Sequence, residues 1–265
     1  MDEKIKALEE LINSSRNIVA FTGAGVSTES GLPDFRGTNG IFRTNEHGST
    51  ESGIPDFRSV DGLYNQKYAY PPEEILSHTF FKGKTEEFYR FYRDKMLCLT
   101  AQPNAAHRKL AQLEAAGRLR SIVTQNIDGL HQLAGSKRVW ELHGSVHRNY
   151  CTRCGKSYSA QWVLSGTGVP KCDCGGVVKP DVVLYEEQLD SDVIEGAVND
   201  IRKADLLIVG GTSLAVYPAA GLINYYRGSR LVLINKSETP RDREADLVLH
   251  GPIGQILDQI KVKPL

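Results

Sequence analysis

The alternation of apolar and polar positions along the chain predicts an α/β fold. Apolar runs with the length of strands lie at 17–22, 121–125, 206–209, 231–234 and 247–249. Stretches with helical spacing or helix-boundary residues lie at 2–14, 84–97, 103–116 and 252–260. Strands that alternate with helices in this way favour a mostly parallel sheet with helices on both faces.

Glycine-rich or polar turns follow several of these strands, at Gly23–Gly25, Gln125–Asp128 and Gly210–Ser213. In a parallel sheet, ligands bind at the carboxyl ends of the strands. Glycines that follow a strand let the backbone approach the pyrophosphate of a dinucleotide. Thr28 stands where the third glycine of Gly-x-Gly-x-x-Gly would be, so a dehydrogenase-type site is not favoured. A glycine turn that binds no nucleotide is the alternative interpretation.

Four of the five cysteines form two closely spaced pairs, Cys151 with Cys154 and Cys172 with Cys174. Two such pairs, with 17 residues between them, favour a tetrahedral zinc site. Four cysteine ligands leave no position for water, so the predicted zinc is structural. Free or disulfide-linked cysteines are the alternative, since the second pair has the less common spacing Cys-x-Cys. The segment 150–178 is therefore predicted to be a small metal-binding module outside the sheet.

One segment of the chain is duplicated. Residues 27–42 return as residues 49–64, with ten of 16 positions identical. A single duplication does not make a solenoid, which needs three or more units. The repeat is therefore interpreted as a local duplication or an insert within one loop.

Composition and charge exclude several classes of partner. The chain has 265 residues, 40% hydrophobic residues and a formal net charge of zero. A neutral chain gives no electrostatic reason to expect direct binding to nucleic acid or to an anionic membrane. No apolar run reaches the roughly 18 residues of a transmembrane helix, and the charged N-terminus lacks the apolar centre of a secretion signal. A cytoplasmic protein without membrane partners is expected.

Taken together, the motifs resemble those of the sirtuin family, and the resemblance covers nearly the whole chain. In the family's order, the matching segments are Gly23–Thr28, Gly31–Arg36, Thr124–Asp128, Leu142–Gly144, the two cysteine pairs and Gly211–Leu214. The resemblance, to a compact bacterial member, implies a Rossmann-like domain made of 1–149 and 179–265. This domain would carry a helical and cofactor-loop insert at about 27–100, and the zinc module would occupy 150–178.

The resemblance also implies an activity, the NAD-dependent removal of acyl groups from protein lysines. Acyl-lysine, NAD and water would give free lysine, nicotinamide and O-acyl-ADP-ribose, with NAD and acyl-lysine entering one cleft from opposite sides. Acetylated lysine peptides or proteins would be the partners, bound as an added strand near Val182–Tyr185. Glu186 places a charge where the family usually has glycine, and we expect it to favour basic peptides.

Roles of single residues follow from the same resemblance. His143 would be the catalytic base, and Asn126 and Asp128 would act beside it, with Asp128 bound to the nicotinamide amide. Phe35 would shield the reacting centre from water. The expected NAD-binding residues are Ala24, Thr28, Phe35, Arg36, Gln125, Asn126, Ile127, Asp128, His143, Gly211, Thr212, Ser213, Asn235, Lys236 and Ile253. Of the other histidines, His131 could help to orient the Asp128 turn, and a structural role is expected for His107.

Two further expectations concern the acyl group and the repeat. Family members that remove succinyl groups carry a Tyr-x-x-Arg pair that lines the acyl pocket. In this chain Arg93 stands one position beyond the arginine of that pair, so acetyl and other neutral acyl groups are favoured as substrates. The first copy, 27–42, is expected to serve the cofactor because it directly follows Gly23–Gly25. Comparing Arg36→Ala with Arg58→Ala would identify the working copy.

Other functions remain open on the residues alone. A sirtuin-like ADP-ribosyltransferase would share the NAD cleft and differ in its acceptor. An NAD- or ADP-ribose-binding module, catalytically impaired by the duplicated loop, would bind the ligand without turnover. A zinc-ribbon interaction protein explains the cysteines, but it explains neither the Gln125–Asp128 turn nor His143.

Overall fold

The computed structural model describes residues 2–33 and 68–265. Within this part of the chain, a six-stranded sheet forms the centre of the molecule, and all of its strand pairs are parallel. Its strands are β1 (Ile18–Thr22), β2 (Leu119–Thr124), β3 (Val139–Glu141), β7 (Leu206–Gly210), β8 (Leu231–Asn235) and β9 (Leu247–His250). The predicted parallel sheet is confirmed, and β3 is a strand that the sequence pattern did not indicate.

The order of the strands identifies the kind of sheet. Across the sheet the order is β3-β2-β1-β7-β8-β9. Counted along the chain, this is the 3-2-1-4-5-6 order of dinucleotide-binding folds. The order reverses between β1 and β7, and such a switch point opens a crevice at the carboxyl ends of the two strands. The turns that begin at Gly23 and Gly210 lie at this position. The Rossmann-like fold class is therefore confirmed.

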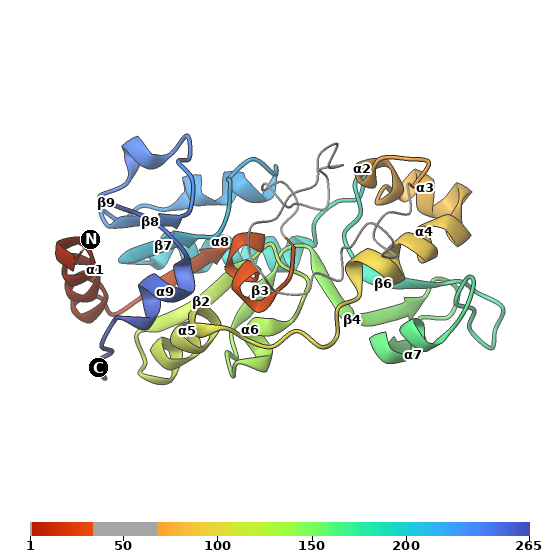
Figure 1. Ribbon diagram of the computed structural model, residues 1–265, viewed down its shortest axis with the longest axis horizontal. Coiled ribbons are helices and arrows are strands. Elements are labelled where there is room, and N and C mark those ends of the chain that lie inside the picture. Colours follow the sequence, from red (N-terminus) through yellow and green to blue (C-terminus); the bar gives the residue numbers. More distant parts are fainter. Residues whose placement is uncertain (1, 34–67) are drawn as a thin grey trace, which may run out of the picture.

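Burial on both faces explains why the central strands are almost entirely apolar. In β1, Ile18 and Ala20 belong to the core cluster on one face of the sheet, and Val19 and Phe21 belong to the cluster on the other. The first face is covered by α1 (Asp2–Ser14), α5 (Ala105–Ala115) and α9 (Ile253–Asp258). The second is covered by α8 (Ser191–Lys203) and the 3-10 helix Ala219–Tyr225. Figure 1 shows α5 and α9 on one side of the strands and α8 on the other.

A second, smaller sheet lies beside the parallel one, at the right of Figure 1. It is antiparallel, with the order β5-β4-β6. Its elements are β4 (Gly144–Cys151), β5 (Ser157–Ser159), α7 (Ala160–Ser165) and β6 (Val178–Val182). The sheet thus begins before the predicted module 150–178 and ends after it. Our division of the chain into domains stays a prediction.

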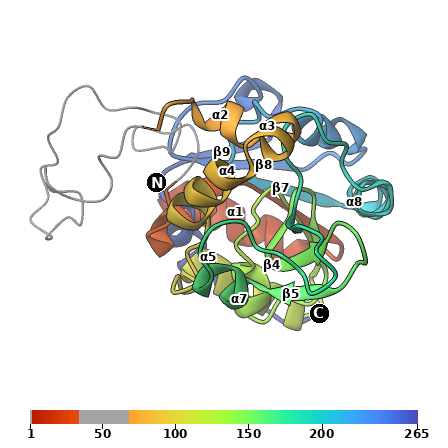
Figure 2. The same cartoon turned by 90° about the vertical axis from the view of Figure 1, so that its right-hand side faces the viewer.

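Short helices pack against this small sheet. They are α2 (Pro72–Ile75), α3 (His78–Gly83) and α4 (Thr85–Phe91), and α4 continues as a π-helix at Tyr92–Met96. Their aromatic residues form one buried cluster with Val146 of β4 and Val182 of β6. Figure 2 looks onto this end of the molecule, with α2, α3 and α4 above β4 and β5.

Local sequence explains two helix boundaries. Helix α5 begins at Ala105 because Asn104 caps it: the Asn104 side chain accepts a hydrogen bond from Ala106 N, and His107 Nδ1 accepts one from Asn104 N. After the Gly23–Gly25 turn, the chain forms two short 3-10 helices, Ala24–Val26 and Thr28–Ser30, instead of the α-helix of a dehydrogenase. The remaining elements are α6 (Leu130–Leu133) and the 3-10 helix Asp242–Glu244. In the described residues, no helix is both long and apolar enough to span a membrane.

Candidate functional site

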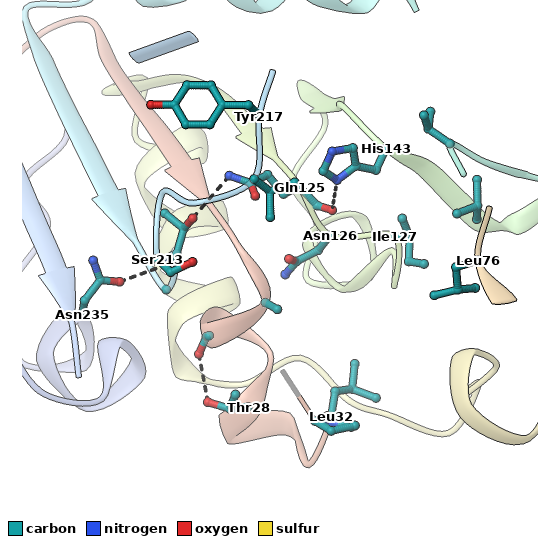
Figure 3. Close-up of a pocket in the computed structure, with 18 of the residues that line it drawn as sticks. Thr28, Leu32, Leu76, Gln125, Asn126, Ile127, His143, Ser213, Tyr217 and Asn235 are labelled. Atoms are coloured by element: carbon teal, nitrogen blue, oxygen red, sulfur yellow. Dashed lines mark hydrogen bonds between the residues drawn. The ribbon is translucent and has the colours of Figure 1, made fainter. Parts of the chain in front are cut away.

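A cavity of about 860 Å³ lies at the carboxyl ends of the parallel strands. One end is formed by the turns after β1, β7 and β8, and the other by residues beside the small sheet. Figure 3 shows the sequence of side chains between these ends, from Asn235 through Ser213 and Gln125 to His143 and Leu76. The cavity therefore connects the parallel sheet to the small sheet.

The glycine turns after β1 and β7 pack directly against one another. Gly25 N donates a hydrogen bond to Gly211 O at 2.7 Å. A Cβ on Gly25 would lie 2.8 Å from Gly211 Cα, and a Cβ on Gly211, whose φ is +63°, would lie 2.3 Å from Val26 N. These glycines are needed because the two turns touch. The expectation that these glycines serve contact with pyrophosphate alone was therefore incomplete.

Asn235 connects β8 to the turn after β7. Its Oδ1 accepts a hydrogen bond from Thr212 N at 3.0 Å. Its Nδ2 is buried and has no hydrogen-bond partner among the described residues, although Asn235 lines the cavity. A buried donor without a partner costs free energy, and a ligand oxygen would satisfy it. This end of the cavity therefore fits a ribose hydroxyl of NAD.

Asp128 belongs to a small network behind the cavity. Ser27 Oγ donates to Asp128 Oδ2 at 2.6 Å, and Asn126 Nδ2 donates to Ser27 Oγ at 3.1 Å. Leu130 N donates to the other carboxylate oxygen, Oδ1, at 2.9 Å. Asn126 lines the cavity, whereas Asp128, a predicted NAD-binding residue, does not and instead lines a second, smaller pocket. Ser27 was missed as a site residue, although it stands inside the Gly23–Thr28 motif.

His143 has a defined tautomer. Its Nδ1 lies 2.9 Å from the backbone oxygen of Gln125. A carbonyl oxygen can only accept, so Nδ1 carries the proton and Nε2 carries the lone pair. Among the described residues, no hydrogen bond engages Nε2. Burial lowers the pKa of His143, and the bond to Gln125 partly offsets this. The ring is therefore neutral near pH 7 and can accept a proton at Nε2.

The structure brings most of the predicted NAD-binding residues together. Those that line the cavity are Ala24, Thr28, Gln125, Asn126, Ile127, His143, Gly211, Thr212, Ser213, Asn235, Lys236 and Ile253. Phe35 and Arg36 lie outside the described residues, as does the choice between the two loop copies. The sequence did not indicate Leu76, Met96 and Tyr217 as lining residues, because no motif marks them.

Two other histidines, which do not line the cavity, lie against each other beneath it. The rings of His107 and His131 are buried, with centroids 4.8 Å apart. His131 Nε2 lies 3.1 Å from Thr22 Oγ1, so its hydrogen bond goes to the end of β1. Burial lowers the pKa of both rings, to about 4 for His107 and about 3 for His131.

The four cysteines Cys151, Cys154, Cys172 and Cys174 form one cluster, with all sulfur atoms within 4.8 Å of one another. Sulfur–sulfur distances are 3.4 Å for Cys151–Cys174 and 3.6 Å for Cys154–Cys172. A disulfide requires about 2.05 Å, whereas a tetrahedron with zinc–sulfur bonds of about 2.3 Å has edges of about 3.8 Å. The cluster therefore fits one structural zinc ion, and the disulfide alternative is wrong.

Comparison with known proteins assigns the family. Residues 47–218 match the model of the Sir2 family, and the match includes the second copy of the repeat. The chain belongs to this family. It is 55% identical to the NAD-dependent protein deacetylase of Clostridium acetobutylicum over 97% of this chain and 98% of the relative. The enzyme of the same name from Clostridium perfringens is also 55% identical, over 98% of this chain and 99% of the relative.

Solved structures give the same assignment. A Sir2 structure with a deacetylated p53 peptide and 3′-O-acetyl-ADP-ribose aligns with a TM-score of 0.81 and 38% identity. It covers 96% of this chain, which covers 95% of it. A Sir2 structure with a p53 peptide and NAD aligns with a TM-score of 0.77 and 38% identity, with the same coverage.

Proposed function

We propose that this chain is an NAD-dependent protein-lysine deacetylase that produces nicotinamide, O-acyl-ADP-ribose and free lysine. One observation carries the proposal: a single cavity joins the crevice of a dinucleotide fold to an imidazole whose Nε2 is available. The family assignment and the relatives' names support the same activity.

NAD binds, in this proposal, along the turns after β1, β7 and β8. Asn235 Nδ2 contacts the adenosine ribose, and Lys236 and Ile253 lie near the adenine. Gly211, Thr212 and Ser213 contact the phosphates and ribose. Ala24 and Thr28 contact the part of NAD that lies over the first turn. All of these residues line the same cavity, which supports an extended ligand.

The reacting end lies near Asn126, Ile127 and His143. Ser27 is hydrogen-bonded to both Asn126 and Asp128. It would therefore hold Asp128 in position for the nicotinamide amide and Asn126 in position for the ribose at the same time. The acyl oxygen attacks C1′ of the nicotinamide ribose, and nicotinamide leaves. His143 Nε2 then takes the proton of a ribose hydroxyl as that oxygen bonds to the former acyl carbon, and water releases free lysine and leaves O-acyl-ADP-ribose. A positioned general base is worth about 10²–10⁴-fold in rate. The neutral ring, held by Gln125, suits this role.

The peptide enters beside Val182–Tyr185, as an added strand that contributes backbone hydrogen bonds. This segment lines the cavity next to His143: Val183 N donates to His143 O at 3.0 Å. On its other side, Tyr185 N donates to Leu76 O at 3.0 Å, which fixes the segment. Relatives with solved structures hold p53 peptides, which supports acetyl-lysine peptides as the substrate class.

Neutral acyl groups are the proposed acyl substrates. The cavity beyond His143 is lined by Leu76, Met96 and Ile127, which are apolar. Arg93 is the cation that would have to bind the carboxylate of a succinyl group. Its guanidinium donates hydrogen bonds to the carbonyl oxygens of Val163 and Gly168 at 2.8 and 2.7 Å. It therefore supports the zinc-bearing segment and does not line the cavity. Turnover of succinyl-lysine equal to that of acetyl-lysine would contradict this proposal.

One assay tests the proposed function. Nicotinamide release from NAD is measured with and without an acetyl-lysine peptide, for the wild type and for His143→Ala. We expect peptide-dependent release that continues through many turnovers only in the wild type. Release without deacetylation would indicate an ADP-ribosyltransferase, and NAD binding without release would indicate a binding module. Comparing Arg36→Ala with Arg58→Ala in the same assay identifies the working loop copy. A cytoplasmic location stays a prediction.

A further inference from the structure

Exposed aromatic residues line the cavity, and one of them, Tyr185, belongs to the proposed peptide segment. Tyr185 and Tyr217 line the cavity, yet 38% and 67% of their surfaces are exposed to solvent. Glu186 follows Tyr185 in the chain, also lines the cavity and is also exposed. An exposed aromatic ring leaves apolar surface in contact with water, and burial of that surface is favourable. These tyrosines are therefore available to pack against a partner.

Glu186 adopts a backbone conformation that favours glycine. Its φ is +74°, in the left-handed region that residues with a Cβ adopt at a cost. The side chain explains how the conformation is held. Its carboxylate accepts hydrogen bonds from Thr79 N at 2.9 Å and from Thr79 Oγ1 at 2.7 Å. These bonds lower the pKa of Glu186, so the carboxylate is charged at neutral pH.

The two neighbouring carboxylates differ in their partners. Glu187 is paired with Lys179 at 3.0 Å and with the His78 ring at 2.8 Å. Glu186 makes no ion pair with any described residue, since its hydrogen bonds go to the uncharged Thr79. Among the described residues, the carboxylate of Glu186 therefore has no ion-pair partner, although the charge of the nearby His78 ring also lowers its pKa. The preceding residue in the chain, Tyr185, has an exposed side chain.

We propose that Glu186, with Tyr185 next to it, selects substrates that carry lysine or arginine next to the acyl-lysine. A cationic side chain can pair with the carboxylate and pack its stem or its charged group on a tyrosine ring. An acidic residue at the same position would be repelled by the like charge of Glu186. The inference rests on the proposed function, because it concerns the flanks of an acetyl-lysine peptide.

Matched peptides test the inference. They carry one acetyl-lysine and differ only in having arginine, alanine or aspartate on either side of it. In the wild type, we expect kcat/KM for the arginine peptide to exceed that for the aspartate peptide by about 5-fold, the scale of exposed ion pairs. The ratio should shrink in high salt, because exposed charges are screened.

Two variants locate the effect. Glu186→Gln keeps an acceptor for Thr79 and removes the charge, so the arginine-to-aspartate ratio should fall towards one. Glu195→Gln removes an equal charge from an exposed position on α8 that does not line the cavity, so the ratio should stay at the wild-type value. Thermal unfolding of both variants checks their folding, and the salt series on the wild type needs no variant.

The possible results distinguish a failure of the role proposed for Glu186 from a failure of the proposed deacetylase activity. Equal kcat/KM for both flanks in the wild type, or a ratio that persists in folded Glu186→Gln, overturns the role of Glu186 and leaves the deacetylase assignment intact. Absence of nicotinamide release with every acetyl-lysine peptide overturns the proposed function itself.

Discussion

The parallel sheet and the cysteine-bearing sheet derive their stability from different sources. The parallel sheet has apolar cores on both faces, with residues such as Leu8, Ile18 and Phe21 fully buried. The cluster around the cysteines contains only Cys151, Cys172 and Val178 as buried members among the described residues. Hydrophobic burial can fold the first sheet. The small sheet packs Val146 and Val182 into the aromatic cluster, but its cysteine-bearing end has almost no apolar core of its own and is expected to need a metal ion.

The candidate site depends on both regions at once. His143 directly precedes β4 of the small sheet, yet its Nδ1 donates to Gln125, which follows β2 of the parallel sheet. β4 ends at Cys151, one of the predicted zinc ligands. A loss of order in either sheet should therefore disturb the position of the proposed catalytic base, His143. Perturbing the regions separately tests how strongly each determines the site.

Removal of zinc should have the largest effect. Structural zinc contributes on the order of 10–16 kcal/mol in small zinc modules, far more than the few buried contacts around the cysteines. We expect a strong chelator, or Cys151→Ser, to abolish turnover while most far-ultraviolet circular dichroism, from the parallel sheet and its helices, remains. Metal analysis should find one zinc per wild-type chain and less in Cys151→Ser.

Cys98→Ser is the matched control for the zinc prediction. Cys98 is exposed and lies outside the sulfur cluster. Its replacement should change neither the zinc content nor the turnover. If Cys151→Ser were as active as Cys98→Ser, the site would not depend on the metal-held sheet.

Loss of the His143 ring should have the next largest effect, without disturbing either region. His143→Ala should lower kcat by about 10²–10⁴-fold, because Nε2 is the proposed proton acceptor. The zinc content and the unfolding temperature should stay near wild-type values, since among the described residues the ring makes a single hydrogen bond, to Gln125. His250→Ala, at a half-exposed position outside the cavity, should keep wild-type kcat. A kcat within 3-fold of wild type in His143→Ala, about 0.7 kcal/mol, would contradict the assignment.

The sequence predicted the parallel-sheet region more fully than the small sheet. Strands such as β1 and β7 are runs of apolar residues, so their burial on two faces is visible in local sequence. Their ends place the cavity residues, including Asn235 and Ser213, and the cysteine spacing places the zinc cluster. In contrast, β3 and the short strands of the small sheet carry no such pattern. Ser145 and Asp181, for example, are paired across 35 intervening residues.

Several functional contacts depend on residues that are far apart in the chain, and no local pattern could reveal them. Ser27 meets Asp128 at a separation of 101 residues, and Thr79 meets Glu186 at a separation of 107. The tight approach of Gly25 to Gly211 is of the same kind. The sequence indicated that these segments are special, but only the fold shows which segments touch.

Acidification should lower the free energy of unfolding through the buried rings of His107 and His131, which lie beside the parallel sheet. Burial holds their pKa values at about 4 and about 3 in the folded protein, against about 6.5 in an unfolded chain. Below pH 6.5 the unfolded state therefore binds protons that the folded state does not, and stability falls as the pH falls towards 4. The expected loss from the two rings together is on the order of 5 kcal/mol, measured by urea unfolding between pH 7 and pH 4.5.

A variant separates this acid effect from that of other groups. His107→Asn lacks one of the two buried rings, so its stability should depend less on pH over the same range, although its stability at pH 7 is lower. The nearby groups that act on His107 are Asp128, which partly offsets burial, and Arg108, which adds to it. A pH dependence identical to that of the wild type would show that the buried pair does not determine acid stability.

Substitution of Asn235 should have the smallest effect. It should change NAD binding at the carboxyl ends of the parallel strands and leave the rest of the site unaffected. The Oδ1 of Asn235 holds Thr212 N, and its buried Nδ2 has no described partner. Asn235→Asp keeps the acceptor and replaces the donor. We expect KM for NAD to rise by up to about 10-fold, the scale of one neutral hydrogen bond, with zinc content and KM for the peptide unchanged. Asn235→Ala also frees Thr212 N, so it should weaken NAD binding further and lower the unfolding temperature slightly. If neither variant changed the KM for NAD, the unpaired amide would not contact the nucleotide, and the two ends of the cavity would not divide the substrates as proposed.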